Sequence, residues 1–221
     1  ASNVRDRGPI TTPSDIMSSS DLGKTWSTIG ECSTCGTIHT LRVGTQSPRT
    51  IFVAGSGGIH RSSDGGNTWV RLSVVPSIGL DLNPRNESIL LAATRENGVY
   101  KSEDSGNSWV HSSTGLTKQG DLKTHRIVIS ETNPDVAYLT THNGVFHSSD
   151  AGETWHSRSN GLGYRFVHAI AIDPRNPDIA YVGTASELNT AHSEHMVDGI
   201  HDGENLYKTT DGGLNWLPSG S

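Results

Sequence analysis

Three histidines and three acidic residues stand together in residues 192–202, a density that could hold a metal ion. Imidazole nitrogens and carboxylate oxygens bind zinc and similar divalent ions. The spacing matches no familiar zinc signature, so the alternative is a polar excursion that closes a rim or contacts a partner. Long loops in compact domains are often functional. The expected ligands of a zinc-like ion are His192, Glu194, His195, Asp198 and His201.

Three other histidines each stand two residues before an apolar stretch that is typical of a strand. They are His39, His125 and His168, and Ile78 holds the same place before a fourth stretch. If these strands are equivalent, the three imidazoles lie at one height, where they could bind a ligand or transfer a proton. The alternative is a framework position, in which each ring packs against neighbouring structure and bonds to the backbone.

The chain has two cysteines, Cys32 and Cys35, in the sequence Cys-Ser-Thr-Cys-Gly. This spacing is found in redox pairs and in half zinc sites. No second cysteine pair accompanies it, which favours a local disulfide that pins a loop. A disulfide that closes so small a loop adds only modest stability.

One carboxylate stands out as a candidate for catalysis. Asp81 lies in an expected strand where the aligned positions hold Arg42, Val128 and Ala171. Glycoside cleavage needs a pair of carboxylates, and spacing alone cannot identify the partner if it comes from a different repeat. A solvated or salt-bridged aspartate is the alternative.

A repeated turn must position all these residues. The pattern Ser/Thr-x-Asp-x-Gly-x-Ser/Thr-Trp occurs five times, with Asn in place of the second Ser/Thr in the last copy. Aspartate and glycine favour a tight turn between two strands, and each indole has roughly 150–250 Å² to bury as an anchor. The five copies contain Asp21 and Trp26, Asp64 and Trp69, Asp104 and Trp109, Asp150 and Trp155, and Asp211 and Trp216.

The aspartates are separated by 43, 40, 46 and 61 residues. A period of about 40–45 residues suits a four-stranded propeller blade. We expect a single domain over 1–221 with blade units at about 1–30, 37–73, 76–113, 123–158 and 165–219, and an insertion at 185–205. The first unit is too short for four strands. Either a five-bladed ring closes with an incomplete blade, or self-association or another chain completes a larger ring.

Two more histidines fall in the third strand of their units. His60 aligns with Met17, Tyr100, Phe146 and Tyr207, so we expect a packing role. His147 aligns with Arg61, Lys101 and Lys208, so we expect a solvated face.

The repeated turn has the pattern of the Asp-box, or BNR, repeat. The chain resembles the Asp-box β-propellers, which include sialidases, xyloglucan-type glycoside hydrolases, sortilin-type ectodomains and photosystem II assembly factors. The resemblance implies an all-β propeller and an extracytoplasmic location. Because these families have unrelated activities, it says little about function. The Arg-Ile-Pro signature of sialidases is missing, since Arg7-Gly8-Pro9 does not match it.

The composition of the chain limits the classes of partner that it is expected to bind. The formal net charge of −6 over 221 residues argues against a nucleic-acid surface. The sequence has no apolar run long enough to cross a bilayer. We therefore expect a non-catalytic scaffold that binds a protein or a saccharide on the face that carries the starts of the first strands. The alternative is a glycoside hydrolase or a fragment of one.

Overall fold

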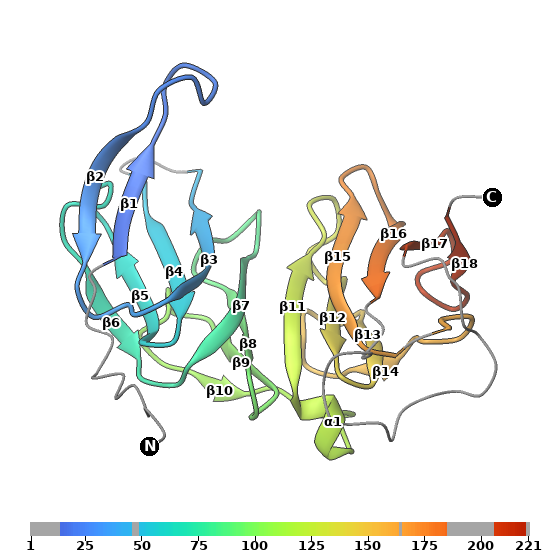
Figure 1. The fold of residues 1–221 in the computed structure, drawn as a ribbon. Helices are drawn as coiled ribbons and strands as arrows, with labels where there is room; N and C mark the ends of the chain where they lie inside the picture. The colour runs from blue at the N-terminus through green and yellow to red at the C-terminus, as the bar shows by residue number, and fades with distance from the viewer. Residues whose placement is uncertain (1–13, 46–48, 164, 185–205, 220–221) are drawn as a thin grey trace, which may run out of the picture. The chain divides into compact units, whose positions relative to one another are not determined.

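The computed structural model describes residues 14–45, 49–163, 165–184 and 206–219, which are almost entirely strands and turns (Figure 1). These residues form five antiparallel sheets in two compact units, Ala1–Pro76 and Ser77–Ser221. The single domain expected from the sequence stays a prediction. No helix among the described residues is long and apolar enough to cross a membrane.

The first unit holds two sheets. The described part of the first sheet is the pair β1 (Ser14–Ser18) and β2 (Ser27–Cys32). The second sheet is a four-stranded meander in sequence order. Its strands are β3 (Ile38–Val43), β4 (Ile51–Gly55), β5 (Gly58–Ser62) and β6 (Val70–Ser73).

The second unit holds three more four-stranded meanders and one short helix, α1 (Gln119–Leu122). The first comprises β7 (Ser77–Leu82), β8 (Leu90–Thr94), β9 (Val99–Ser102) and β10 (Val110–His111). The second comprises β11 (Thr124–Ile129), β12 (Ala137–Thr141), β13 (Gly144–Ser148) and β14 (His156–Ser157). The third comprises β15 (Val167–Asp173), β16 (Asn176–Thr184), β17 (Leu206–Thr209) and β18 (Leu217–Pro218).

The second strand of three sheets is buried along its whole length. Every residue of β4, β8 and β12 is buried, on both faces of the sheet. Their continuous apolar and small residues, such as Phe52-Val53-Ala54, suit a strand covered on both sides. The meander order and the buried second strands confirm the prediction of four-stranded propeller blades, and two strands of the first sheet fall within the described residues.

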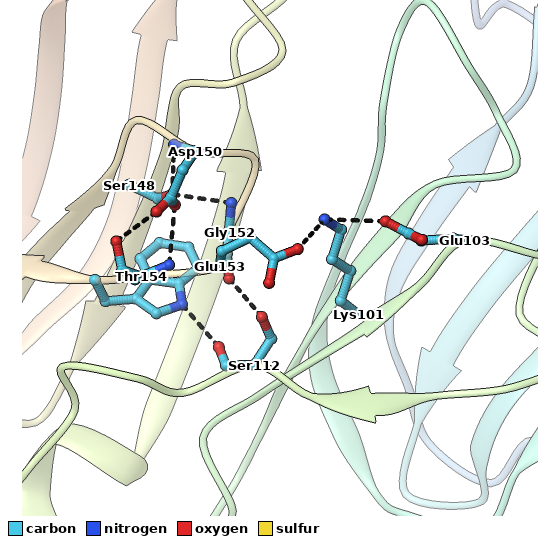
Figure 2. A network of polar contacts seen from close by, with 9 residues as sticks. Lys101, Glu103, Ser112, Ser148, Asp150, Gly152, Glu153 and Thr154 are labelled. Atoms are coloured by element: carbon cyan, nitrogen blue, oxygen red, sulfur yellow. Dashed lines mark hydrogen bonds and ion pairs between the residues drawn. The ribbon is translucent and has the colours of Figure 1, made fainter.

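The repeated turn has the same hydrogen bonds in all five copies, and Figure 2 shows the fourth. The Ser148 hydroxyl donates to Asp150 Oδ1 over 2.7 Å and accepts from the Gly152 amide over 2.9 Å. Asp150 Oδ1 also accepts from the Thr154 amide over 2.9 Å, and Oδ2 accepts from the Thr154 hydroxyl. In the last copy the Asn215 side-chain amide takes the place of that hydroxyl. The serine and threonine of the pattern are therefore hydrogen-bond partners of the aspartate within the turn.

The five indoles of the pattern are not equally buried. Trp155 and Trp216 are each 1% exposed, and their Nε1–H groups donate to the carbonyl oxygens of Ser112 and Arg158 over 2.8 and 2.7 Å. These two carbonyls belong to the preceding sheet or the chain that leaves it, so the indole joins two sheets. Trp26 is 60% exposed and donates to Gly23 in its own turn, so the prediction that every indole is a buried anchor is wrong there. Its sheet has no preceding sheet among the described residues.

The face that carries His147 is also less solvated than expected. His147 is half-buried and lies edge-on to Tyr138 with ring centroids 4.9 Å apart. Lys101, at the aligned position, is buried and pairs with Glu153 of the next sheet and with Glu103 at 3.2 Å (Figure 2). Burial favours the neutral amine, but the hydrogen bonds and charges of the two glutamates raise the pKa of Lys101. At Lys101 this column therefore makes a contact between sheets, whereas His147 packs within its own sheet.

Candidate functional site

A β-bulge interrupts the first strand of every four-stranded sheet. The pairing with the second strand skips one residue, between Ile38 and Thr40 in β3 and at the equivalent place in β7, β11 and β15. A bulge re-aims the side chain of the extra residue and is common beside functional sites. The skipped residues are His39, Ile78, His125 and His168. The four residues that the sequence alignment placed together are therefore the bulge residues of the four first strands.

In the second unit the bulges bring two of the predicted histidines together. The ring centroids of His125 and His168 lie 4.4 Å apart. His142 stacks on His125 at 4.8 Å with the ring planes 7° apart. Phe166 lies edge-on to all three imidazoles, at 4.4 Å from His142 and from His168 and at 5.1 Å from His125. We call these four residues the histidine cluster. His39 occupies the same bulge in the first unit.

Two members of the cluster were missed by sequence reasoning. His142 follows the end of β12 directly, and its amide donates to the Lys123 carbonyl over 3.0 Å. Phe166 lies just before β15, two residues ahead of His168. An alignment of the second strands extended by one residue places His142 at the same position as Arg95 and Ser56, and would have identified it as a polar residue at the end of its strand. No repeat signal marks Phe166.

Two imidazoles of the cluster, His125 and His168, have lowered pKa values that favour the neutral form. Burial lowers the pKa of His125 to about 3, helped by the charges of His168, His142, Arg95 and Arg126. Burial also lowers the pKa of His168. The Nε2 atom of His125 is buried without a hydrogen-bond partner. At neutral pH the cluster is thus an aromatic surface with an unused polar atom, flanked by positive charge.

The cluster makes the second unit less stable in mild acid. Between pH 6.5 and about 3 the folded chain binds fewer protons at His125 than the unfolded chain does, so the free energy of unfolding falls as the pH falls. His125→Ile, which copies Ile78 at the same bulge, should flatten this dependence between pH 6.5 and 4. Urea unfolding followed by circular dichroism at several pH values measures it. Equal pH slopes for the two proteins would contradict the assignment.

The other predicted residues stand apart from the cluster. Asp81 Oδ2 accepts from the Ile129 amide over 2.8 Å and Oδ1 from the Leu82 amide over 3.1 Å, so this carboxylate ties β7 to β11. Its role in catalysis stays a prediction. Cys32 and Cys35 form the expected disulfide. The proposed metal ligands of residues 192–201 lie outside the described residues.

An open groove in the first unit adjoins the start of β3. Its volume is about 500 Å³, and its lining includes Asp15, Ile16, Thr37, Ile38 and Leu41. The groove offers apolar side chains beside one carboxylate. It therefore gives the first unit a concave surface at the same end of the first strand as the bulge.

Two solved structures show what the fold is similar to. An ancestral GH74 enzyme is 20% identical with a TM-score of 0.72, and the match covers 92% of this chain and 28% of that one. The structure of YCF48 bound to D1 peptide is 17% identical with a TM-score of 0.54, covering 88% of this chain and 56% of that one. The chain thus spans less than two thirds of either protein. No family model and no curated protein matches the sequence.

The sheets and these similarities define a β-propeller fold. At such low identity the likeness concerns the fold alone, and function must be argued from the site.

Proposed function

We propose that this chain is a non-catalytic binding scaffold whose ligand contacts the starts of the first strands, at the histidine cluster. The observation that carries the proposal is the packing of His125, His142, His168 and Phe166 at two adjacent bulges. Strands β11 and β15 hold His125 and His168, and a preorganised surface binds with little loss of conformational freedom. The half-buried or exposed positions of the four rings leave edges and faces for contact.

The chemistry of the cluster favours a ligand with a flat or ring-shaped group. Aromatic rings and neutral imidazoles pack against sugar rings and aromatic side chains. Arg95 and Arg126 are exposed and close enough to affect His125, so a negatively charged group on the ligand would be favoured. Peptides and saccharides both offer this combination. The similar protein YCF48 was solved with a peptide bound, which supports a peptide as one class to test.

Arrays of peptides and glycans would test the proposal. We expect a binder whose affinity falls at least roughly tenfold in the double variant His125→Ile and His168→Ile, as for loss of a central contact. Isoleucine is the matched replacement because Ile78 occupies the same bulge. The affinity of the variant His39→Ile tests whether the third aligned histidine also contacts the ligand. If every ligand bound the double variant as tightly as the wild type, the cluster would not be the site.

The second candidate is a glycoside hydrolase or a part of one, supported by the fold of the ancestral GH74 enzyme. Chromogenic glycosides incubated in parallel with the arrays distinguish the two. Turnover that is lost in Asp81→Asn would favour the enzyme. Binding without turnover favours the scaffold.

A third candidate is a part of a larger ring completed by another chain. This chain covers only 28% of the ancestral GH74 enzyme and 56% of YCF48, and this partial coverage supports the third candidate. Mass measurement in solution tests it, since a complete ring predicts a monomer and a shared ring predicts a defined oligomer.

A further inference from the structure

Both cysteines of the chain and one buried histidine meet in the first unit. Cys32 ends β2, Cys35 lies in the following turn, and His60 lies on β5. The two Sγ atoms and one ring nitrogen of His60 all lie within 4.8 Å of one another. The three residues are 1%, 1% and 0% exposed. They form the one such group of possible metal ligands in the described part of the chain.

His60 differs in type from the residues at the aligned positions, and packing alone does not require a histidine there. The aligned positions of the other three four-stranded sheets hold Tyr100, Phe146 and Tyr207, and the first sheet holds Met17. The Nε2 atom of His60 bonds to the Thr34 hydroxyl over 2.9 Å, while Nδ1 is buried with no well-aligned hydrogen-bond partner. A buried polar atom without a partner is unfavourable.

We propose that Cys32, Cys35 and His60 bind a thiophilic cation of the Zn²⁺ class when the cysteines are reduced, and that the disulfide replaces this site on oxidation. Two thiolates and an imidazole suit zinc rather than magnesium or calcium. Zinc bonds of about 2.3 Å to sulfur and 2.0–2.1 Å to nitrogen place ligand atoms roughly 3.5–3.8 Å apart. The imidazole nitrogen already lies within 4.8 Å of both sulfur atoms, and the two sulfur atoms, bonded to each other in the disulfide, must move apart to that spacing after reduction.

Apolar side chains surround the two cysteines. Ile16 and Val53 belong to the same buried cluster as the two cysteines. The fourth position of a tetrahedral zinc ion would be filled by a water molecule. Burial, followed by the charge of Arg71, lowers the pKa of His60, with a weaker opposing effect of the Gly58 backbone. A neutral imidazole is the form that binds metals. Thr34 can hold the imidazole in place, as partners of metal-bound histidines commonly do.

The exchange between the two forms balances as a two-electron step. An external dithiol gives two electrons and two protons to the pair, the Sγ–Sγ bond breaks, and the dithiol becomes a disulfide. Metal binding then releases both thiol protons. Oxidation by an external disulfide reverses the step and releases the cation. A newly made chain enters the cycle in the thiol form.

Titration with Co²⁺ under anaerobic conditions tests the site, with a phosphine as the reductant. We expect one equivalent of Co²⁺ to produce the thiolate-to-metal charge-transfer absorption, and Zn²⁺ to displace it. Residues 185–205 contain no cysteine, so cobalt bound there cannot give this signal. The oxidised wild type should show no such absorption.

The matched variant is His60→Phe, which copies Phe146 and keeps an apolar ring in the column. We expect its affinity for Zn²⁺ to fall more than roughly tenfold, since even partners of the ligands contribute 10–100-fold. His60→Gln is a second variant should phenylalanine disturb the sheet, and circular dichroism confirms folding of both. Absence of the charge-transfer signal in the reduced wild type would overturn the proposal. So would equal zinc affinity in either folded variant.

Discussion

Trp155→Ala should lower the free energy of unfolding of the second unit by about 3–5 kcal/mol, as loss of a fully buried indole does. The side chain is 1% exposed, lies in a cluster with Leu91 and Ile127, and donates to the Ser112 carbonyl over 2.8 Å. Removing it leaves a cavity at the junction of two sheets and an acceptor without its donor. Urea unfolding followed by circular dichroism measures the loss.

Trp26→Ala is the matched control because it changes the same residue of the same pattern. Trp26 is 60% exposed and bonds within its own turn. We expect a change within about 0.5 kcal/mol, as for most surface substitutions. Similar losses for the two variants would mean that contact with a preceding sheet is not what makes the indole an anchor.

Gly115→Ala should destabilise the second unit by about 3 kcal/mol, the sum of two costs. Gly115 has φ of +97°, and a Cβ there would lie 2.0 Å from the carbonyl oxygen of Trp155. A left-handed conformation costs a residue with a side chain roughly 1–2 kcal/mol, and overpacking adds roughly 1–3 kcal/mol. The backbone cannot move away easily, because the Trp155 amide donates to the Thr114 carbonyl over 2.8 Å.

Gly212→Ala separates the two effects. Gly212 has φ of +71°, and the nearest atom to a Cβ there is Asp178 Oδ1 at an ordinary 3.4 Å. At the same place in other copies of the turn stand Ser105 and Ala151, with φ of 59° and 57°. We expect a cost of about 1 kcal/mol, from the positive φ alone. Thermal unfolding compares the two glycines, and equal losses would exclude a steric role for Gly115.

Much of the fold follows from residues close together in the sequence. The aspartate, glycine and hydroxyl residues of the turn bond to one another within a few positions, so the turn appears in any copy of the pattern. The column of His125 and His168 was also found by alignment, because the bulge recurs at one place in each first strand. The repeated local sequence is therefore enough to predict both the turn and the aligned bulge positions.

What the sequence could not show depends on contacts between repeats. Trp155 and Trp26 have the same neighbours along the chain but different neighbours in space, so their burial differs. Phe166 joins the histidine cluster from a connection that has no repeat signal. Likewise, Cys32 and Cys35 were interpreted as a local pair, because the approach of His60 requires the fold of the second sheet.

The central claim is that His125, His142 and His168 form a ligand surface. Nuclear magnetic resonance of ¹³C-labelled imidazoles, recorded while the strongest array binder is added, tests it most directly. We predict that the ring signals of these three histidines shift together and saturate, while that of the exposed His111 in the same unit does not. Saturating binding that leaves all three signals unchanged would contradict the claim.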